Sequence, residues 1–344
     1  MSRDLILTAP RELAFEEVPD APLGPGELRV RTLFSGISAG TELTQYRGTS
    51  PFMDRRFDEA RRLFVSGEAP SWPYPVRTLG YEEVGEVVEL GSGVVDVPLG
   101  SHVFGTWNHR THAVISAEYA RSRAMPPGAD PRIGIFSHIG AVALNGVHDA
   151  QIRLGDTVAV FGLGVPGQIV AQAARASGAS VIAVDPDPDR RAVALKLGAH
   201  HALAPAAAET IKDLTGGKGA DVCIEVSGAA LALSDAIRSV AYASRVVAMG
   251  FYQGEVAGLR LGDEFHHNRI ELISSQISGV APAASHRWSK PRLWRAAVEL
   301  QQAGTLDLLP LITHTAAFAD APALFARLDA GEAGMMQTML EFGA

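Results

Sequence analysis

The sequence predicts an α/β protein with two domains, a partly open antiparallel β-barrel and a doubly wound domain built on a parallel sheet. Its 344 residues, 47% of them hydrophobic, are enough for two full cores. Residues 5–33 alternate short apolar runs with proline and glycine, a pattern typical of antiparallel strands joined by tight turns. From Thr157 onward, short apolar runs alternate with helical stretches, which indicates right-handed crossovers and a parallel sheet.

The first domain contains two segments that a core does not require. After a strand predicted at Glu27–Thr32, residues 35–43 combine small and polar side chains, which favours a functional loop. The segment Thr49–Thr78 is long for a connection, so we expect a partly helical insertion over the substrate site. A surface excursion unrelated to substrate is the alternative. Valines alternating with polar residues predict a barrel strand within 79–91, continued at 100–105.

The second domain begins with the motif on which the functional prediction depends. The β-branched run Thr157–Phe161 is typical of a buried parallel strand. It leads into Gly162–Gly167, with the sequence GLGVPG. The first glycine permits a tight turn, the second lets backbone approach a pyrophosphate, and the third lets a helix pack closely on the strand. Free N–H groups at the start of that helix would bind the phosphate.

A second strand, Ser180–Val184, ends at Asp185. A carboxylate at this point accepts hydrogen bonds from both ribose hydroxyls and repels a 2′-phosphate, so the motif favours NAD over NADP. Arg190 could lie along the ribose or offset Asp185, or it could belong to a solvated helix start. The alternative for the whole motif is a doubly wound domain with a chance glycine turn that binds no nucleotide.

The remaining pattern extends the sheet and then returns to the first domain. We predict helices at 190–197, 231–240 and 291–303, and strands at 220–226, 244–249 and 270–278, the last at the sheet edge. The predicted domain boundaries are 1–130 for the first part of the barrel domain, 131–282 for the nucleotide-binding domain, and 283–344 for the return.

Composition excludes several classes of partner. The net charge of −8 and the absence of a basic run longer than a pair argue against nucleic acid or an anionic membrane. No apolar run reaches membrane-spanning length and the N-terminus lacks a signal-peptide core, so we expect a cytoplasmic protein. The lone cysteine, Cys223, lies in an apolar run and is expected to be a buried strand residue. His109, His112 and the pair His266–His267 are expected on the surface or in loops.

Taken together, the motifs resemble those of the medium-chain alcohol dehydrogenase superfamily over essentially the whole chain. They are the segments 35–37 (SGI), 40–43 (GTEL), 46–48 (YRG), 80–82 (GYE), 162–167 and 250–252 (GFY), with Asp185. The resemblance implies a GroES-like barrel domain made from both ends of the chain, a central Rossmann domain, and an active site in the cleft. It also implies cofactor contacts from Gly162, Gly164, Val165, Pro166, Gly167, Asp185, Arg190, Ser227, Gly250, Phe251 and Tyr252.

The chain departs from the zinc-containing members of that superfamily and looks most similar to the zinc-lacking branch grouped with bacteriochlorophyllide a dehydrogenase. Where zinc members have cysteine, histidine and cysteine, this chain has Ser38, Tyr81 and the pair Ser137–His138. Hydroxyl groups are poor zinc ligands at neutral pH, so we predict no metal site. A remnant site from Glu82, His138 and His102 is the alternative.

Without a Lewis acid, the reacting oxygen still needs a proton donor or acceptor. Thr41 matches the hydroxyl of the family's proton relay, Tyr81 replaces a metal ligand and is expected to point at the reacting oxygen, and His138 could relay a proton near pH 7. Glu82 is a further candidate, or a buried acid in a hydrogen-bond network. The alternatives are structural: a turn residue for Thr41, packing under the insertion for Tyr81, and a helix histidine with backbone partners for His138.

The sequence therefore predicts a zinc-independent oxidoreductase that transfers hydride between NAD(H) and a secondary alcohol or ketone on a fairly large small-molecule substrate. Reduction of an activated carbon–carbon double bond is an alternative, against which Asp185 speaks because such relatives usually take NADPH. A non-catalytic nucleotide-binding protein is a second alternative. In relatives the strand that matches 270–278 pairs with its two-fold mate, so we also expect a homodimer.

Overall fold

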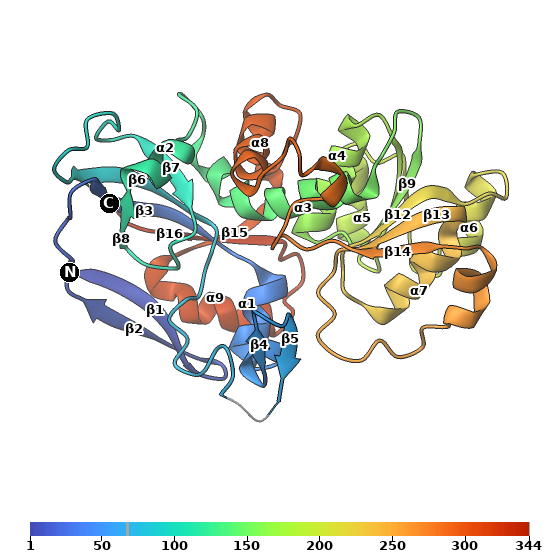
Figure 1. Ribbon diagram of the computed structural model, residues 1–344, viewed down its shortest axis with the longest axis horizontal. Coiled ribbons are helices and arrows are strands. Elements are labelled where there is room, and N and C mark those ends of the chain that lie inside the picture. The colour runs from blue at the N-terminus through green and yellow to red at the C-terminus, as the bar shows by residue number, and fades with distance from the viewer. Residues whose placement is uncertain (67–68, 344) are drawn as a thin grey trace. The chain divides into compact units, whose positions relative to one another are not determined.

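The computed structural model describes residues 1–66 and 69–343, and the chain divides into two units (Figure 1). Unit 1 comprises Met1–His138 and Leu309–Ala344, and unit 2 comprises Ile139–Leu308. The return to unit 1 thus lies well after the expected residue 283. The reason is that helix α8 (Lys290–Gln302) packs against α3 (Ser137–Ala150) so closely that a Cβ at Gly140 would lie 2.7 Å from Ala297.

Unit 1 is built on a mixed sheet to which both ends of the chain contribute. The strand order is β15-β16-β3-β6-β7, with β8 also paired to β3, and β1 and β2 form a separate antiparallel pair. Strand β16 from the C-terminal segment pairs antiparallel with β3, as the Thr338–Ile37 register shows. The bounds are β1 Ser2–Ala9, β2 Glu12–Val18, β3 Glu27–Ile37, β6 Glu83–Leu90, β7 His102–Gly105, β8 His112–Ser116, β15 Ile312–Ala317 and β16 Gln337–Glu341.

The predicted functional loop at 35–43 is wrong as a description of the backbone. Strand β3 continues to Ile37, and helix α1 (Ala39–Arg47) follows at once, with Ser38 as its N-cap residue. The Glu42 side chain reaches back and accepts a hydrogen bond from the Ser38 N–H (2.8 Å), which stabilises this helix start. Helix α1 then packs on α9 (Ala321–Asp329) within an apolar cluster of unit 1. A short helix, α2 (Ala117–Ser122), follows β8.

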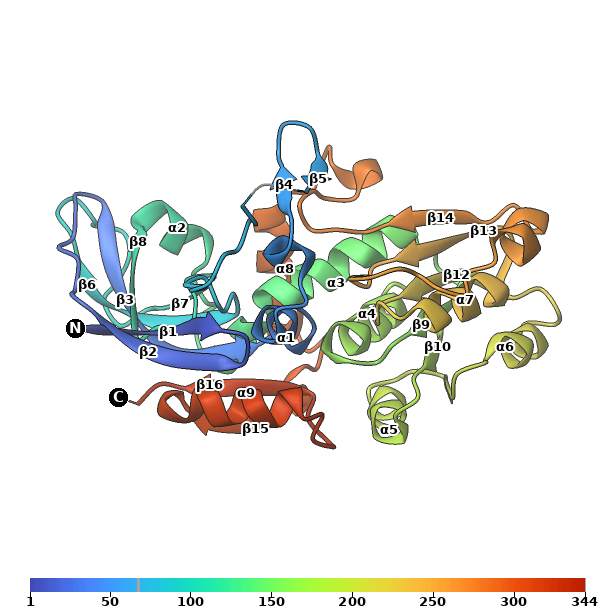
Figure 2. The ribbon, with the colours of Figure 1, turned by 90° about the horizontal axis from the view of Figure 1, so that it is seen from below.

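The insertion at 49–78 contains less helix than expected. After one 3₁₀ turn (Pro51–Met53), the chain forms a small hairpin of β4 (Arg56–Asp58) and β5 (Leu63–Val65), which projects from unit 1 in Figure 2. Aromatic side chains pack this segment together: the rings of Phe52 and Trp72 stack with their centroids 4.4 Å apart. Residues 67 and 68 of the predicted insertion lie outside the described residues. That the insertion covers substrate stays a prediction.

Unit 2 is the predicted doubly wound domain. Its six-stranded parallel sheet has the order β11-β10-β9-β12-β13-β14, so the chain starts at the centre, proceeds to one edge and then crosses to the other. Helices cover the sheet (Figure 1). The strands are β9 Thr157–Phe161, β10 Ser180–Val184, β11 His201–Leu203, β12 Ala220–Glu225, β13 Val240–Ala248 and β14 Glu271–Ser274. The helices, besides α3 and α8, are α4 Val165–Ala176, α5 Pro188–Lys196, α6 Ala208–Leu214 and α7 Ala230–Ser239.

Two general expectations can be compared with this architecture. The expected α/β fold with a doubly wound parallel sheet is confirmed, while the sheet of unit 1 is mixed and not purely antiparallel, because β15 pairs parallel with β16. In the part of the chain that the structure describes, no helix combines the length and apolarity needed to cross a membrane.

Candidate functional site

The glycine turn of unit 2 shows why glycine is required at two of its positions. Gly162 follows β9 with φ +89°, and a Cβ there would lie 2.7 Å from Ser227. At Gly167, in the first turn of α4, a Cβ would lie 1.8 Å from the carbonyl oxygen of Gly162. A Cβ at Gly164 would meet nothing within 4 Å, so the space beside the helix start is open. Val165 and Pro166 begin α4, whose first-turn N–H groups can bind an anion.

Asp185 holds this turn in place. The residue is buried, and its carboxylate accepts hydrogen bonds from the backbone N–H groups of Leu163 (2.6 Å) and Asp187 (2.8 Å). One carboxylate therefore links the glycine turn after β9 to the segment between β10 and α5. Its predicted bond to ribose hydroxyls would come in addition to this structural role.

Four of the predicted cofactor residues line one cavity of about 580 Å³ in unit 2. They are Gly162, Asp185, Arg190 and Ser227. The cavity wall also includes apolar side chains, among them Leu231, and so it can take an apolar ring together with a polar sugar. The Arg190 guanidinium lies 3.5 Å from the Asp187 carboxylate, so it offsets the charge of Asp187 more directly than it offsets the charge of Asp185.

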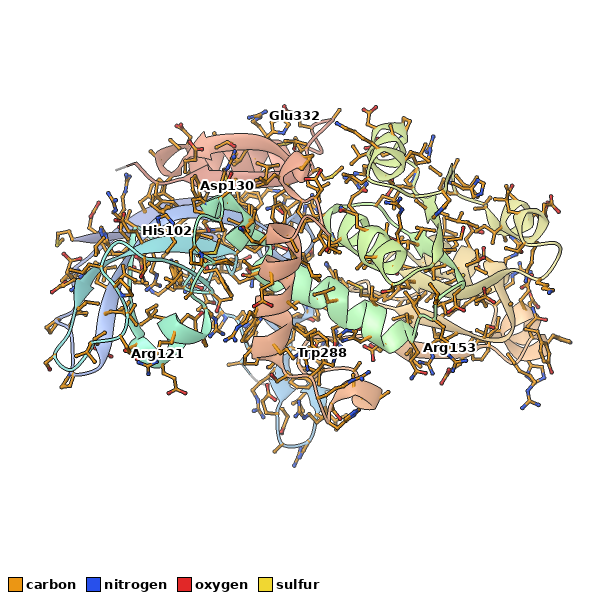
Figure 3. The ribbon with its side chains drawn as sticks, turned by 90° about the horizontal axis from the view of Figure 1, so that it is seen from above. His102, Arg121, Asp130, Arg153, Trp288 and Glu332 are labelled. Atoms are coloured by element: carbon orange, nitrogen blue, oxygen red, sulfur yellow. The ribbon has the colours of Figure 1, made fainter. Side chains whose placement is uncertain are left out.

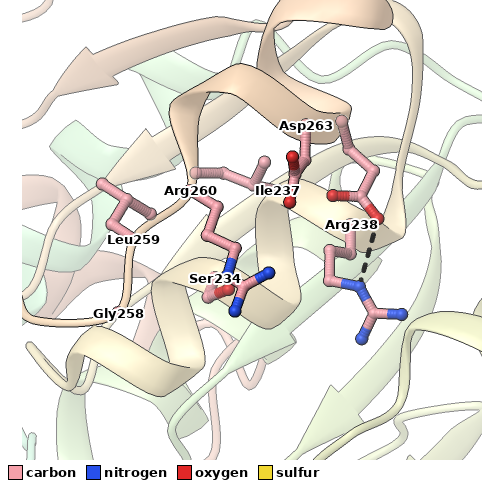
Figure 4. Close-up of a pocket in the computed structure, with 8 residues that line it drawn as sticks. Ser234, Ile237, Arg238, Gly258, Leu259, Arg260 and Asp263 are labelled. Atoms are coloured by element: carbon pink, nitrogen blue, oxygen red, sulfur yellow. Dashed lines mark hydrogen bonds and ion pairs between the residues drawn. The ribbon is translucent and has the colours of Figure 1, made fainter.

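A smaller pocket of about 270 Å³ shares Ser234 and Arg238 with this cavity (Figure 4). Arg238 pairs with Glu264 at 3.3 Å, and the pocket wall further contains Arg260 and Asp263. Its two arginines are thus balanced by two carboxylates, and the pocket has no net charge that would favour a phosphate.

A buried carboxylate that the sequence analysis missed organises the remaining cofactor residues. Glu225 ends β12, and it accepts hydrogen bonds from the N–H groups of Ser227 (2.8 Å) and Gly228 (3.1 Å) and from the hydroxyls of Ser227 and Tyr252. Gly250 is held so close that a Cβ on it would lie 2.1 Å from the Gly228 nitrogen. The turns after β12 and β13 are therefore fixed to each other. The sequence signal that could have identified Glu225 is its position as an acidic residue within the apolar run 221–226.

Burial raises the pKa of Glu225, although the hydrogen bonds to its carboxylate act in the opposite direction. Burial likewise raises the pKa of the Tyr252 hydroxyl, so this group keeps its proton and donates it in a hydrogen bond to Glu225. Phe251, between Gly250 and Tyr252, is exposed.

In unit 1, the structure brings the predicted catalytic residues Thr41 and His138 together around a third, Tyr81. The Tyr81 hydroxyl donates to the Ser38 Oγ, and the Thr41 side chain lies close enough to Tyr81 to lower the pKa of its hydroxyl. The rings of Tyr81 and His138 are tilted, with centroids 4.8 Å apart. Burial raises the pKa of Tyr81, and the nearby carboxylates of Glu82 and Glu42 raise it further, so the phenol stays neutral and can donate a proton.

Glu82 lies in a different environment from the other three. It is buried, accepts a hydrogen bond from the Gln337 amide (3.2 Å), and is packed so that a Cβ on Gly36 would lie 2.4 Å from its Oε2. Burial, with the neighbouring Glu42 and Glu83 carboxylates, raises its pKa well above the usual range. Glu82 is thus a buried acid in a hydrogen-bond network, and its surroundings favour its neutral form.

His109 lies in the loop between β7 and β8, but its side chain is fully buried, so the surface position expected as the other possibility is wrong. Nε2 lies 2.8 Å from Glu42 and Nδ1 lies 2.7 Å from the Ser35 hydroxyl, which itself bonds to Glu83 at 3.0 Å. The alternation of sequence that predicts strands gives no indication of such a contact, since the partners come from segments far apart in the chain. His266 and His267 are exposed, as expected.

The donor set in unit 1 does not fit zinc. The Tyr81 hydroxyl is already bonded to Ser38, and Glu82 bonds to Gln337. His102 begins β7 (Figure 3), and it does not join Glu82 and His138 in a metal-binding group. Across residues 1–66 and 69–343, no group of three histidine, cysteine, aspartate or glutamate side chains could hold a metal ion.

Comparison with known proteins gives consistent relatives. Residues 166–295 match the family described as zinc-binding dehydrogenase. The D-guloside 3-dehydrogenase of Escherichia coli (strain K12) is 35% identical over 329 residues, 93% of this chain and 94% of that protein. The L-threonine 3-dehydrogenase of Pyrococcus horikoshii is 29% identical over 367 residues, covering 96% and 95%. The crystal structure of 2R,3R-butanediol dehydrogenase from Bacillus subtilis has a TM-score of 0.79 at 22% identity, with 99% of each chain covered.

Proposed function

We propose that this chain, which belongs to the medium-chain dehydrogenase/reductase superfamily and is an oxidoreductase, interconverts a secondary alcohol and a ketone without zinc. The observation that carries the proposal is the cluster of hydroxyls formed by Ser38, Thr41 and Tyr81. Two of them, Ser38 and Tyr81, stand at positions where zinc members have metal ligands.

The cofactor we propose is NAD(H). The support is the cavity of unit 2, where the glycine turn and Asp185 lie together and where a second negative charge on the ribose would face the Asp185 carboxylate. When bound, the nicotinamide supplies or accepts the hydride.

In the proposed reduction, Tyr81 donates its hydroxyl proton to the carbonyl oxygen as hydride reaches the carbonyl carbon. The proton lost from Tyr81 is replaced through Ser38 or Thr41. In the oxidation the same steps run backwards, and Tyr81 receives the alcohol proton after passing its own to this hydroxyl relay. The carbon–oxygen double bond forms as the hydride leaves. His138 packs beside the Tyr81 ring and helps to exclude water from it.

The substrate class we propose is a glycoside or another sugar derivative oxidised at a secondary hydroxyl. The named relatives support it, because a guloside dehydrogenase acting at C3 and a threonine dehydrogenase acting at C3 both oxidise a secondary carbinol. The aromatic rings of the 49–78 insertion offer apolar faces of the kind on which sugar rings stack.

We further propose a homodimer and a cytoplasmic location. Strand β14 is the edge strand of the parallel sheet, so it is available to pair with a second copy. Sedimentation at micromolar concentration should give the mass of a dimer, and a monomer would contradict the proposal.

The experiment that tests the function is turnover of a panel of glycosides and simpler secondary alcohols with NAD or NADP, followed by the absorbance of the reduced cofactor. We expect oxidation of at least one glycoside, faster with NAD. Tight NAD binding without turnover of any alcohol, ketone or activated alkene would instead indicate a non-catalytic nucleotide-binding protein.

A further inference from the structure

We infer that His109 is a positioning residue for proton transfer: held as a cation between Glu42 and Glu83, it fixes the helix start that carries Ser38 and Thr41 against Tyr81. This inference rests on the proposed function, because the hydroxyls that it positions are those proposed to move the proton.

The link from His109 to the hydroxyl cluster runs through one carboxylate. Glu42 lies with Oε2 at 2.8 Å from His109 Nε2, while its Oε1 accepts the backbone N–H of Ser38 at 2.8 Å. Ser38 in turn accepts the hydrogen bond of Tyr81 through its Oγ. The position of the Ser38 backbone is thus set by a carboxylate whose other oxygen is held by the imidazole.

The proton count on the other side of the ring indicates that the imidazole is a cation. Ser35 donates its one hydroxyl proton to Glu83 at 3.0 Å, so it can only accept at 2.7 Å from His109 Nδ1. The carboxylate of Glu42 likewise accepts from Nε2. Both ring nitrogens therefore carry hydrogen when Glu83 is ionised, and the backbone N–H of Trp107 donates to the second oxygen of Glu83 at 2.8 Å.

His109 also fixes the segment that carries Tyr81. Its backbone N–H donates to the carbonyl of Leu79 at 2.8 Å. Gly80, at φ +96°, leaves the space that the ring occupies, since a Cβ there would lie 2.7 Å from His109 Nδ1. One buried residue thus contacts both segments of the hydroxyl cluster, which are almost 40 positions apart in the sequence, at 38–42 and 79–81.

The charges around the ring come from two elements. Glu42 of α1 and Glu83 of β6 face it, while Ser35 of β3 and the Phe325 ring of α9 complete its surroundings. Burial alone would lower the pKa of His109, but the two carboxylates raise it above the ordinary value. Because the Glu42 charge also raises the pKa of Tyr81, loss of the imidazolium should raise it further.

The test compares His109→Gln with His112→Gln, a control in the adjoining strand β8 whose ring bonds only to Thr111 among the contacts described. For His109→Gln we expect kcat to fall about tenfold to a hundredfold with KM for NAD unchanged, since a displaced proton donor slows the chemical step while unit 2 is untouched. We also expect the rise of kcat with pH in alcohol oxidation, where Tyr81 accepts the alcohol proton, to move to higher pH. The control should keep the unmodified rate and profile.

A second variant separates positioning from folding. Glu42→Gln combined with His109→Gln removes both charges, so the pH profile should return toward that of the unmodified enzyme although kcat stays low. An unshifted profile in His109→Gln, or a double variant shifted as far as the single one, would overturn the inference.

A measurement on the unmodified protein does not depend on turnover. Nitrogen–proton correlation spectra of the imidazoles should show one histidine with both ring nitrogens protonated at pH 8, and the signals should vanish in His109→Gln. A neutral His109 at that pH would overturn the inference even if the enzyme is active. Conversely, a protonated His109 in a protein that oxidises no substrate would point to failure of the proposed function alone. If His109→Gln does not fold, Glu42→Gln replaces it in the spectra, and His109 should become neutral.

Discussion

The two units hold their functional groups in opposite ways. In unit 2, the buried carboxylates Asp185 and Glu225 are satisfied mainly by backbone N–H groups of neighbouring turns, and glycines set the distances. In unit 1, the buried acids Glu42 and Glu83 are bound to His109, to hydroxyls and to single backbone groups from distant segments. The functional groups of unit 2 are therefore held in place mainly by backbone geometry, and those of unit 1 by interactions between charged and polar side chains.

This difference has an energetic consequence. Burial costs a carboxylate little free energy when several N–H groups bond to it. Removing one partner of a buried charged pair, in contrast, leaves the other charge uncompensated, at a cost of several kcal/mol. Substitutions in the polar cluster of unit 1 should thus affect both rate and pH dependence. Those in the cofactor cavity should act mainly on affinity.

The largest effect is expected for Tyr81→Phe, which removes only the hydroxyl that the proposed mechanism uses. The value of kcat should fall by roughly a hundredfold to ten-thousandfold with little change in NAD affinity. Thr41→Val should give a smaller loss in the same direction. The exposed Tyr242 provides the control, because Tyr242→Phe should have no effect. Unmodified rates in both site variants would move the proton transfer to His138 or to water.

That prediction rests on a residue pattern that the sequence displays only in part. The GLGVPG turn, the strand Ser180–Val184 and Asp185 could be predicted because their chemistry lies within one continuous stretch, and the observed strand has the predicted bounds. Tyr81 and Thr41 were found through the motifs that contain them. Their contact through Ser38 depends on folding.

The elements that sequence reasoning missed have the opposite character. The burial of His109 was missed because a single histidine carries no periodic signal, and its partners are 67 and 74 positions away. The start of α1 was interpreted as a loop because small and polar residues are common in both. Strand β11, only three residues long, was too short for its alternation to be detected.

The next effect concerns stability and tests the polar character of unit 1. Burial raises the pKa of Glu83 to about 7, against the lowering effect of His109 and the hydrogen bonds. The folded protein therefore binds the Glu83 proton more tightly than the unfolded chain does. The stabilisation that this proton provides is lost as pH rises from the unfolded pKa of about 4.5 to the folded pKa of about 7. His109, whose pKa is also raised, acts in the same direction as pH passes through its folded value.

Chemical denaturation at several pH values measures this term. Between pH 4.5 and 7 the free energy of unfolding should fall by roughly 3 kcal/mol at most from Glu83. Glu83→Gln should flatten the fall, while Glu89→Gln, which changes an exposed acid near the end of the same strand, should not. A stability that is constant or rising across this range would contradict an acid buried in this way.

The smallest effect is expected in unit 2. Asp185→Asn removes the charge that would oppose a 2′-phosphate and weakens one backbone contact of the glycine turn, so the preference for NAD over NADP should narrow by about tenfold. Asp189→Asn removes the same charge from an exposed position on α5 and serves as the control. Binding of both cofactors followed by protein fluorescence gives the ratio. NADP binding as tight as NAD to the unmodified protein would refute the assignment.

We propose that side-chain hydroxyls, and not zinc, handle the proton in this member of a superfamily whose matching family is described as zinc-binding. The most direct measurement is the turnover rate of metal-analysed protein before and after treatment with a strong chelator. We expect far less than one zinc per chain and an unchanged rate, because Ser38 and Tyr81 bond to each other and do not form a ligand set. About one zinc per chain, with activity lost on chelation and restored by added zinc, would contradict it.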